Sequence, residues 1–235
     1  MTSEKYRRIS FDPILHYITA VFIGIPLCAL FFLLILIGRV RIKGYRTALR
    51  LAARGNLIIT ANHPSMFETI LIPLIFFPLP LLHLRFFVWS VPDRRLLPPK
   101  LRWLFRITRC ITIDRSNHGT AKHTLKRITQ VLSTHGVVII HPEAGRTFKG
   151  EEFITLGERR MRSFVSGVPA LARNASATIL PLWISGTDIV MPYGAWLPRF
   201  IRSKITFSFG TSYRVLKKGK REEESSQLAR AILTS

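Results

Sequence analysis

Apolar residues in this chain gather in short runs, and the runs alternate with longer stretches in which apolar residues return at helical spacing. One such stretch covers 120–135 and ends before Gly136, a residue type that often follows the last turn of a helix. The proline at 169 favours the start of a short helix over 169–174. Runs of strand length lie at 57–61, 111–113, 137–141, 178–184 and 205–209. Apolar strands separated by helices predict an α/β fold with a mostly parallel central sheet flanked by helices.

The longest apolar run covers residues 21–38, eighteen positions without a charged side chain. A helix that crosses a bilayer needs about 17–25 residues, so this run is close to the lower limit. Basic residues such as Arg8 and Arg41 lie on both sides of the run and therefore give no preferred orientation. We expect residues 1–41 to form an N-terminal membrane anchor, either a half-inserted helix or hairpin with both ends on one face, or a short span.

Beyond this anchor, the chain divides into a long folded part and a short charged tail. A second apolar run, 69–82, contains three prolines and is typical of a buried or interfacial helix that breaks up. The alternation of strands and helices then continues as far as the last apolar strand, whereas residues 217–224 are dense in charge. We therefore expect one domain over 42–216 and a charged C-terminal tail over 217–235, frayed at 217–224.

The charge of the chain narrows the class of partner. Its 235 residues include 35 Lys and Arg against 13 Asp and Glu, a net charge of +22 that favours nucleic acid, a phospholipid surface or a phosphate-bearing substrate. A mean hydropathy of +0.23 is unusual for a soluble nucleic-acid binder, and no nucleic-acid motif accompanies the charge. A basic amphipathic helix predicted over 98–109 suits an anionic membrane surface, with an ordinary solvated face as the alternative. We expect an anionic membrane partner and no nucleic acid.

The cysteines give no reason to expect a metal or an oxidising compartment. Cys28 and Cys110 form neither a CxxC pair nor part of a metal quartet. Both lie in or beside apolar runs, which is typical of small buried hydrophobic residues. We expect structural thiols, no bound metal and no redox cofactor.

The first motif with candidate chemistry is Asn62-His63-Pro64-Ser65-Met66-Phe67-Glu68, directly after the strand predicted over 57–61. On one continuous helix His63 and Glu68 would point about 140° apart. Pro64 disfavours helical backbone at His63 and is itself favoured at a first helical position, so His63 is predicted to lie off the helix with its ring folded back toward Glu68. A carboxylate that accepts one ring N–H leaves the other nitrogen free to take a proton from an alcohol.

The second motif is His141-Pro142-Glu143-Ala144-Gly145-Arg146-Thr147, directly after the strand predicted over 137–141. Ligands of α/β sheets bind at the carboxyl ends of strands, and an arginine there binds phosphate well. Glu143 is expected to hold Arg146 or a backbone loop rather than to perform chemistry. The remaining histidines are expected to be structural, with lining of the pocket as the alternative for His141.

In this order and spacing, the motifs resemble those of the glycerolipid acyltransferase family, the lysophosphatidic acid acyltransferases and their relatives. That family carries NHxxxxD, a strand ending in an arginine, PEGTRS, and an apolar strand with a central proline. The corresponding segments here are Asn62–Glu68, Ile113-Asp114-Arg115, Pro142–Thr147 and Ile179–Trp183. The resemblance extends from about residue 42 to residue 209 and implies a glycerol-3-phosphate acyltransferase-like fold.

The resemblance also implies a reaction and a set of residues that carry it. It implies transfer of a fatty acyl group from acyl-CoA or acyl carrier protein to a lysophospholipid hydroxyl of the 1-acylglycerol-3-phosphate type. His63 would be the general base and Glu68 its orienting partner, on a protein held at the cytoplasmic face of the inner or plasma membrane. The residues expected to shape the acceptor site are Asn62, Arg115, Glu143, Gly145, Arg146 and Thr147.

Two departures from the family pattern leave alternatives open. Glu68 stands where the common motif has aspartate, and a similar His–x4–Glu occurs in the related lipid A acyltransferases. Ala144-Gly145 stands where the family has Gly-Thr, which removes a hydroxyl near the acceptor. One alternative is therefore another lipid acceptor: a lipid A precursor, an ornithine lipid or a glycolipid. The other is a non-catalytic basic protein that binds membranes or nucleic acid.

Overall fold

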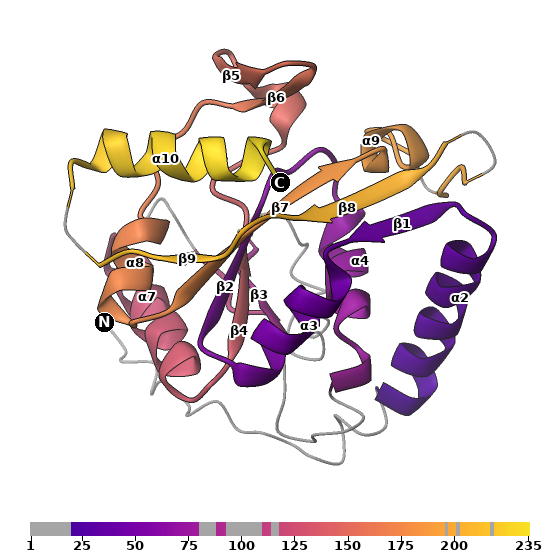
Figure 1. The fold of residues 1–235 in the computed structure, drawn as a ribbon, viewed down its shortest axis with the longest axis horizontal. Helices are drawn as coiled ribbons and strands as arrows, with labels where there is room; N and C mark the ends of the chain where they lie inside the picture. Colours follow the sequence, from indigo (N-terminus) through magenta and orange to yellow (C-terminus); the bar gives the residue numbers. More distant parts are fainter. Residues whose placement is uncertain are drawn as a thin grey trace, which may run out of the picture.

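The structure is a computed structural model, and it describes residues 20–79, 88–92, 110–113, 118–195, 197–200, 203–216 and 219–235. Within these residues one seven-stranded sheet runs in the order β1-β8-β7-β2-β4-β3, and β9 pairs with β7 beside this path (Figure 1). The strands are β1 (Val40–Lys43), β2 (Leu57–Ala61), β3 (Val88–Ser90), β4 (Val137–Ile140), β7 (Thr178–Ser185), β8 (Ile205–Phe209) and β9 (Tyr213–Arg214). A separate antiparallel hairpin is formed by β5 (Phe153–Leu156) and β6 (Arg159–Arg162).

Most strand pairs in the sheet are parallel, as the apolar runs predicted. The pairs β2·β4, β2·β7, β3·β4 and β1·β8 are parallel, whereas β7·β8 and β7·β9 are antiparallel. In the centre, β2 is buried at all five positions because it has neighbours on both sides and helices over both faces. This burial on two faces explains why its sequence, LIITA, does not alternate between apolar and polar residues.

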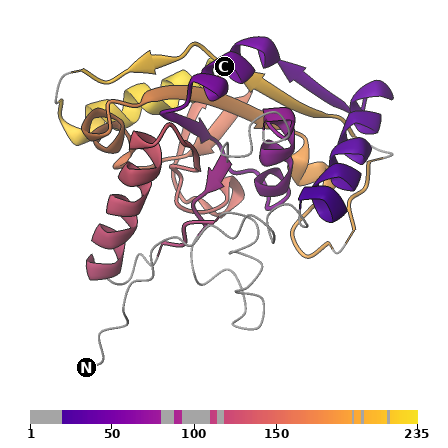
Figure 2. The ribbon, with the colours of Figure 1, turned by 90° about the horizontal axis from the view of Figure 1, so that it is seen from below.

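Helices cover both faces of the sheet, and alternate strand residues pack toward each layer. Ile59 belongs to the core shared with α2 (Ile25–Leu36), α3 (Tyr45–Arg54) and α4 (Glu68–Ile75). Ile58 faces the other core, shared with α7 (His118–Ser133), α8 (Val168–Asn174) and α10 (Arg221–Leu233). Figure 2 shows α7 and α2 on opposite sides of the molecule. The remaining short elements are η1 (Ala20–Gly24), η4 (Thr147–Lys149) and α9 (Thr187–Val190).

The C-terminal end of α7 differs from the prediction by one residue. Gly136 was expected to be the residue that follows the last turn, but the residue in that position is His135, which adopts a left-handed φ of 59°. The His135 N–H donates to the Leu132 carbonyl and the Gly136 N–H to the Val131 carbonyl, which together form a Schellman motif. Gly136 is still needed there, because a Cβ atom on it would collide with Val131.

Of two further predictions about local structure, the structure contradicts one and confirms the other. Residues 111–113 do not form a strand: Cys110 makes an isolated bridge with Ser90, and Ile111 donates one backbone hydrogen bond to Ser90. The apolar run after residue 68 does form a helix that ends early, as predicted, with Pro73 inside α4 and the last helical residue at Ile75. The helix predicted over 98–109 and residues 80–82 of the second apolar run lie outside the described residues.

A helix begins within the charged C-terminal segment, so the prediction that residues 217–224 are frayed is wrong from Arg221 onward. Residues 221–233 form α10, whose first turn carries three glutamates where negative charge stabilises a helix N-terminus. Behind this charged turn, Leu228, Ala229, Ile232 and Leu233 are buried against the sheet. The sequence analysis missed this helix because the charged residues at its start outweigh its apolar positions in the local composition.

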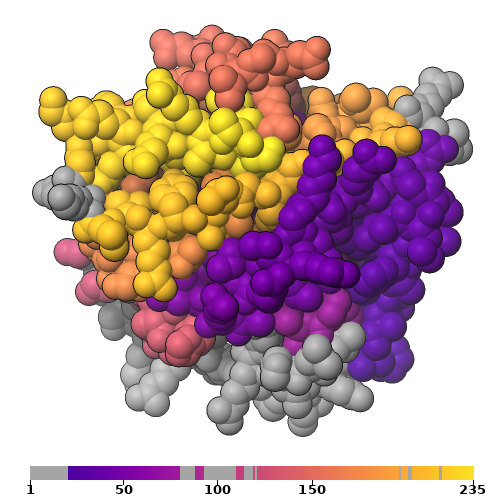
Figure 3. All heavy atoms as spheres, viewed as in Figure 1, coloured from indigo at the N-terminus to yellow at the C-terminus, as the bar shows by residue number. Residues whose placement is uncertain are grey.

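The N-terminal apolar segment packs one side of α2 against the rest of the fold. Cys28, Phe31 and Leu34 are buried, whereas the opposite side of the helix exposes a row of large apolar side chains. In Figure 3 the indigo atoms of this segment form the right-hand edge of the molecule. Among the residues that the structure describes, no helix has the length and apolar character needed to cross a bilayer.

Candidate active site

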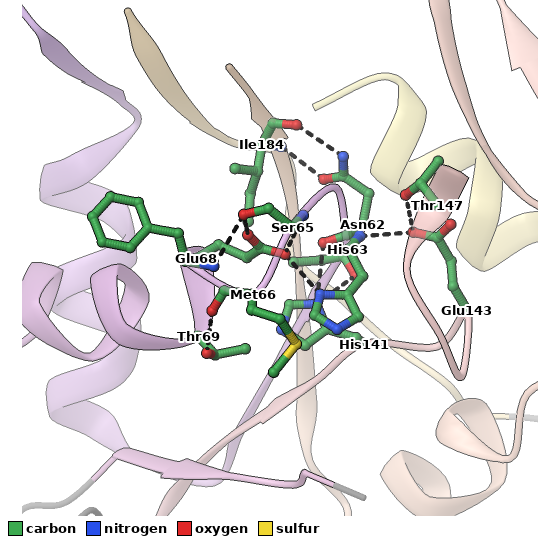
Figure 4. A network of polar contacts seen from close by, with 12 residues as sticks. Asn62, His63, Ser65, Met66, Glu68, Thr69, His141, Glu143, Thr147 and Ile184 are labelled. Carbon is green, nitrogen blue, oxygen red and sulfur yellow. Dashed lines mark hydrogen bonds and ion pairs between the residues drawn. The ribbon is translucent and has the colours of Figure 1, made fainter. Parts of the chain in front are cut away.

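The two motifs predicted to carry chemistry meet at the carboxyl ends of β2 and β4. These strands are parallel neighbours in the register Thr60↔Ile140, so the segments that follow them emerge side by side. Asn62 and His63 come directly after β2, and residues 141–147 come directly after β4. Figure 4 shows His63 between Glu68 on one side and Glu143 on the other. This is the edge of the sheet at which α/β proteins bind ligands.

His63 and Glu68 form a short polar contact in this site, as the spacing around Pro64 predicted. His63 Nδ1 lies 2.6 Å from Glu68 Oε1, and both residues are buried. His63 lies off the helix, as expected, but Pro64 does not open it, because α4 begins only at Glu68. The intervening turn is closed by Ser65 instead, whose hydroxyl accepts a hydrogen bond from the Phe67 N–H.

Glu68 is held in a polar cage although the residue is fully buried. Its Oε1 accepts the Ser65 N–H at 3.0 Å, and its Oε2 accepts the Ser65 hydroxyl at 2.8 Å. Burial by itself raises the pKa of Glu68, but the hydrogen bond and the charge of His63 oppose it, and the pKa is lowered. An ionised Glu68 accepts the Nδ1–H of His63, which leaves the lone pair of that ring on Nε2.

Glu143 supports the position of His63 through the backbone. One carboxylate oxygen accepts the His63 N–H at 2.7 Å and the Thr147 hydroxyl at 3.0 Å, and the other accepts the Arg162 N–H at 2.7 Å. The Thr147 N–H in turn donates to the His63 carbonyl at 2.8 Å. Burial raises the pKa of Glu143, against the lowering effect of these hydrogen bonds. Of the two partners expected for Glu143, the backbone is the one observed.

Asn62 links the end of β2 to β7. Its amide nitrogen donates to the Ile184 carbonyl at 2.8 Å, and its amide oxygen accepts the Ile184 N–H at 2.8 Å. Asn62 is 2% exposed. The side-chain contacts of Asn62, like those of Glu143 and Thr147, are therefore made to the protein itself, in loops that were expected to shape the acceptor site.

Arg146 is the predicted binding residue whose charged group lies at the rim of the site. Its guanidinium carbon lies 4.5 Å from the ring centroid of Tyr193 and 5.4 Å from that of Phe148. Lys149 approaches the same Tyr193 ring at 5.1 Å. Neither cation has a carboxylate of the described residues within salt-bridge distance. The two positive charges are thus held on an exposed aromatic ring, in the way that cation–π contacts hold them.

Of the other two predicted binding residues, Gly145 lies in the loop after β4, and Arg115 lies in a part of the chain that the structure does not describe. Gly145 lies against Arg162, whose guanidinium would be 2.9 Å from a Cβ atom at this glycine. Sequence reasoning missed Tyr193, which follows α9 far along the chain and carries no local signal.

His141 is the second histidine of the site, and pocket lining was only the alternative expected for it. Its ring stacks on that of His63, with ring centroids 4.4 Å apart and an interplanar angle of 21°. Its Nδ1 lies 3.2 Å from the Ala61 carbonyl and 3.0 Å from the Asn62 carbonyl. The signal available in the sequence was its place at the end of an apolar strand; that this strand lies beside the one before His63 is seen only in the structure. In the described part of the chain, no group of three His, Cys, Asp or Glu is placed to hold a metal ion.

Comparisons with known proteins identify the fold and the family of this chain. Among the curated proteins, none matches this chain in sequence. The solved structure of the 1-acyl-sn-glycerophosphate (LPA) acyltransferase PlsC from Thermotoga maritima is similar, with a TM-score of 0.59 and 17% identity over 94% of this chain and 92% of that one. This likeness confirms the expected α/β fold with its mostly parallel sheet. The model of the acyltransferase family matches residues 39–185, a range that includes both motifs, and the chain therefore belongs to the acyltransferase family.

Proposed function

We propose that this acyltransferase moves a fatty acyl group from a thioester donor to the hydroxyl of a lysophospholipid, with His63 as the general base. The observation that carries this proposal is the 2.6 Å contact between His63 Nδ1 and the buried Glu68. It fixes the tautomer whose Nε2 accepts a proton, at the sheet edge where substrates of α/β enzymes bind. The resemblance of both motifs to the glycerolipid acyltransferases supports the same roles.

The reaction needs one proton acceptor and no covalent acyl-enzyme. His63 Nε2 takes the proton of the acceptor hydroxyl as its oxygen attacks the thioester carbonyl. The tetrahedral intermediate then collapses, the carbon–sulfur bond breaks, and the leaving thiolate takes the proton back from His63. General base catalysis of this kind contributes about 10²–10⁴-fold in rate. Glu68 favours the transient imidazolium because its negative charge lies against Nδ1.

The two cations at the rim of the site favour an acceptor that carries phosphate. Arg146 and Lys149 share the Tyr193 ring and leave their positive charges available to an anion. An arginine binds phosphate oxygens through two parallel hydrogen bonds, which makes it the more selective of the two cations. We therefore place the phosphate of a 1-acylglycerol-3-phosphate acceptor at Arg146.

The outer side of α2 supports association with a membrane surface. Its exposed apolar residues include Leu30, Phe32, Leu33 and Leu36, of which Leu36 is 81% exposed. A twelve-residue helix is about 18 Å long, shorter than the ~30 Å core of a bilayer, so a half-inserted anchor suits it better than a span. An enzyme held in this way meets an acceptor that is itself a membrane lipid. We place it at the cytoplasmic face, where either acyl-CoA or acyl carrier protein serves as donor.

A different lipid acceptor is the second candidate, and one feature of the site favours it. Ala144-Gly145 replaces the Gly-Thr of the family motif, so the loop that carries Arg146 lacks a hydroxyl there. A lipid A precursor, an ornithine lipid or a glycolipid would then be the acceptor. The reaction and the role of His63 would be unchanged.

Lipid mass spectrometry tests these assignments together. Cells that express the wild-type protein are compared with cells that express His63→Ala at equal protein level. We expect lysophosphatidic acid to fall and its diacyl product to rise only with the wild type. A change confined to a phosphate-free lipid would favour the second candidate. Identical lipids in both cells, with tight binding to vesicles or duplex DNA, would favour a non-catalytic binding protein.

A further inference from the structure

We propose that His141 is a positioning residue for the acyl transfer, which holds the His63 ring in place by stacking on its face; this rests on the proposed function. The two rings lie 4.4 Å apart between centroids and are close to parallel. The edge of the His63 ring is fixed by Glu68, but an edge contact alone leaves the ring free to tilt. A second flat group against its face removes that freedom.

His141 is anchored to the same piece of backbone that carries His63. Its Nδ1 lies 3.0 Å from the Asn62 carbonyl and 3.2 Å from the Ala61 carbonyl, the two residues directly before His63. Carbonyl oxygens only accept hydrogen bonds, so Nδ1 carries the hydrogen in this arrangement. The stacked ring and the ring that it supports therefore share one rigid attachment at the end of β2.

The anchored ring also stays neutral while His63 changes its charge. Burial lowers the pKa of His141 to about 4, and the neighbouring His63 acts in the same direction. Of the titratable side chains described, His63 and Glu68 are those that act on it, and the opposing effect of Glu68 is smaller than that of burial. A neutral ring does not repel the imidazolium that forms on His63 during the reaction.

The buried Nε2 of His141 argues that this residue does more than fill space in the core. Its Nε2 is buried and has no hydrogen-bond partner among the residues that the structure describes. A buried acceptor without a partner lowers stability, so an apolar ring of similar size would serve a purely structural role better. Residues that break such a rule without a gain in stability are expected at functional sites.

The test combines two substitutions with a readout that does not depend on activity. His141→Ala removes the ring and its anchor, and we expect kcat to fall about 10–100-fold with KM unchanged, since small displacements of a reacting group cost rates of that order. His141→Phe keeps a flat ring but loses the Nδ1 hydrogen bond, so it should retain more of kcat than His141→Ala, and thermal unfolding checks that both variants are folded. Equal kcat in all three proteins would overturn the proposal.

A double-mutant cycle shows whether His141 acts through His63. In a His63→Ala background there is no base to position, so adding His141→Ala should change the residual rate by less than twofold. A further 10–100-fold loss in that background would mean that His141 acts independently, and would overturn the proposal.

Nuclear magnetic resonance of histidine-labelled protein separates this proposal from the proposed function. In the wild type we expect the His63 nitrogens to report one tautomer, protonated at Nδ1. In His141→Ala the two nitrogen shifts should move toward each other as the ring becomes mobile. Unchanged His63 shifts in His141→Ala would overturn the positioning role whatever the activity, whereas absence of acyl transfer by the wild type would count against the proposed function alone.

Discussion

The two buried carboxylates of the site have the same side chain but opposite surroundings. Glu68 contacts a titratable ring and a hydroxyl, and its pKa is lowered because the interactions with His63 outweigh its burial. Glu143 contacts two backbone N–H groups and a threonine, and its pKa is raised because burial dominates. The two carboxylates therefore differ in what they hold: Glu68 contacts the ring of His63, and Glu143 binds the backbone of His63 and Arg162.

Glu68→Gln should have its main effect on activity. Glutamine is similar in size but carries no charge, so it cannot stabilise an imidazolium on His63. We expect kcat to fall about 10²-fold with a smaller effect on KM, in line with the contribution of a base whose charged partner is removed. Steady-state kinetics with a thioester donor and lysophosphatidic acid measure both constants. Wild-type kcat in this variant would show that the charge of Glu68 plays no part.

Glu143→Gln should have its main effect on stability. One of the three hydrogen bonds must lose its acceptor, because an amide offers one oxygen where the carboxylate offered two. A buried donor without a partner costs about 1–3 kcal/mol, which urea unfolding measures. The activity of the folded fraction should change less than in Glu68→Gln. A larger loss of kcat than stability explains would place Glu143 in the chemistry itself.

The contributions of Glu68 and Glu143 to stability should change in opposite directions as the pH falls. Glu68 has a folded pKa below the ordinary value of 4.5, so its contribution is present above 4.5 and is lost as pH falls through the folded value. Glu143 has a raised folded pKa, so its contribution to stability is present below 4.5 and is lost as pH rises through the folded pKa. Between pH 7 and pH 3, Glu68→Gln should therefore lose less stability than the wild type, and Glu143→Gln should lose more. Parallel curves for the three proteins would contradict both assignments.

Arg146→Ala tests the rim of the site rather than its centre. We expect KM for lysophosphatidic acid to rise about tenfold with little change in kcat, because removing an arginine that binds phosphate at a partly exposed rim costs about 1–2 kcal/mol. Arg50→Ala, which removes an exposed arginine from α3, is the matched control for the loss of one positive charge. Equal effects of the two substitutions would point to general electrostatic attraction.

The smallest expected effect concerns the loop that carries Arg146. Ala144 has a φ of 59°, in the left-handed region that glycine adopts without strain, and it stands where the family motif has glycine. Ala144→Gly should raise the free energy of unfolding by about 1 kcal/mol. Thermal unfolding measures the change, and a lower stability would show that the alanine methyl group makes contacts that outweigh the strain.

The sequence predicted the local parts of this site better than the parts that depend on distant contacts. The contact between His63 and Glu68 followed from Pro64, although the helix begins later than that residue suggested. The hydrogen bonds of Asn62 with Ile184 could not be predicted, because they depend on the register of β2 against β7. The position of Tyr193 beside Arg146 could not be predicted either, because the two residues are far apart in the sequence. Helix α10 was missed because the charged residues at its start concealed its apolar face.

The central claim is that His63 removes the proton of the acceptor hydroxyl. The most direct test is chemical rescue of His63→Gly by added imidazole, measured as acyl transfer to lysophosphatidic acid in mixed micelles. We predict that the variant loses at least about 10²-fold in rate, that imidazole restores part of this loss, and that the rescue grows with the concentration of neutral imidazole. A variant that transfers acyl groups at the wild-type rate without imidazole would contradict the account.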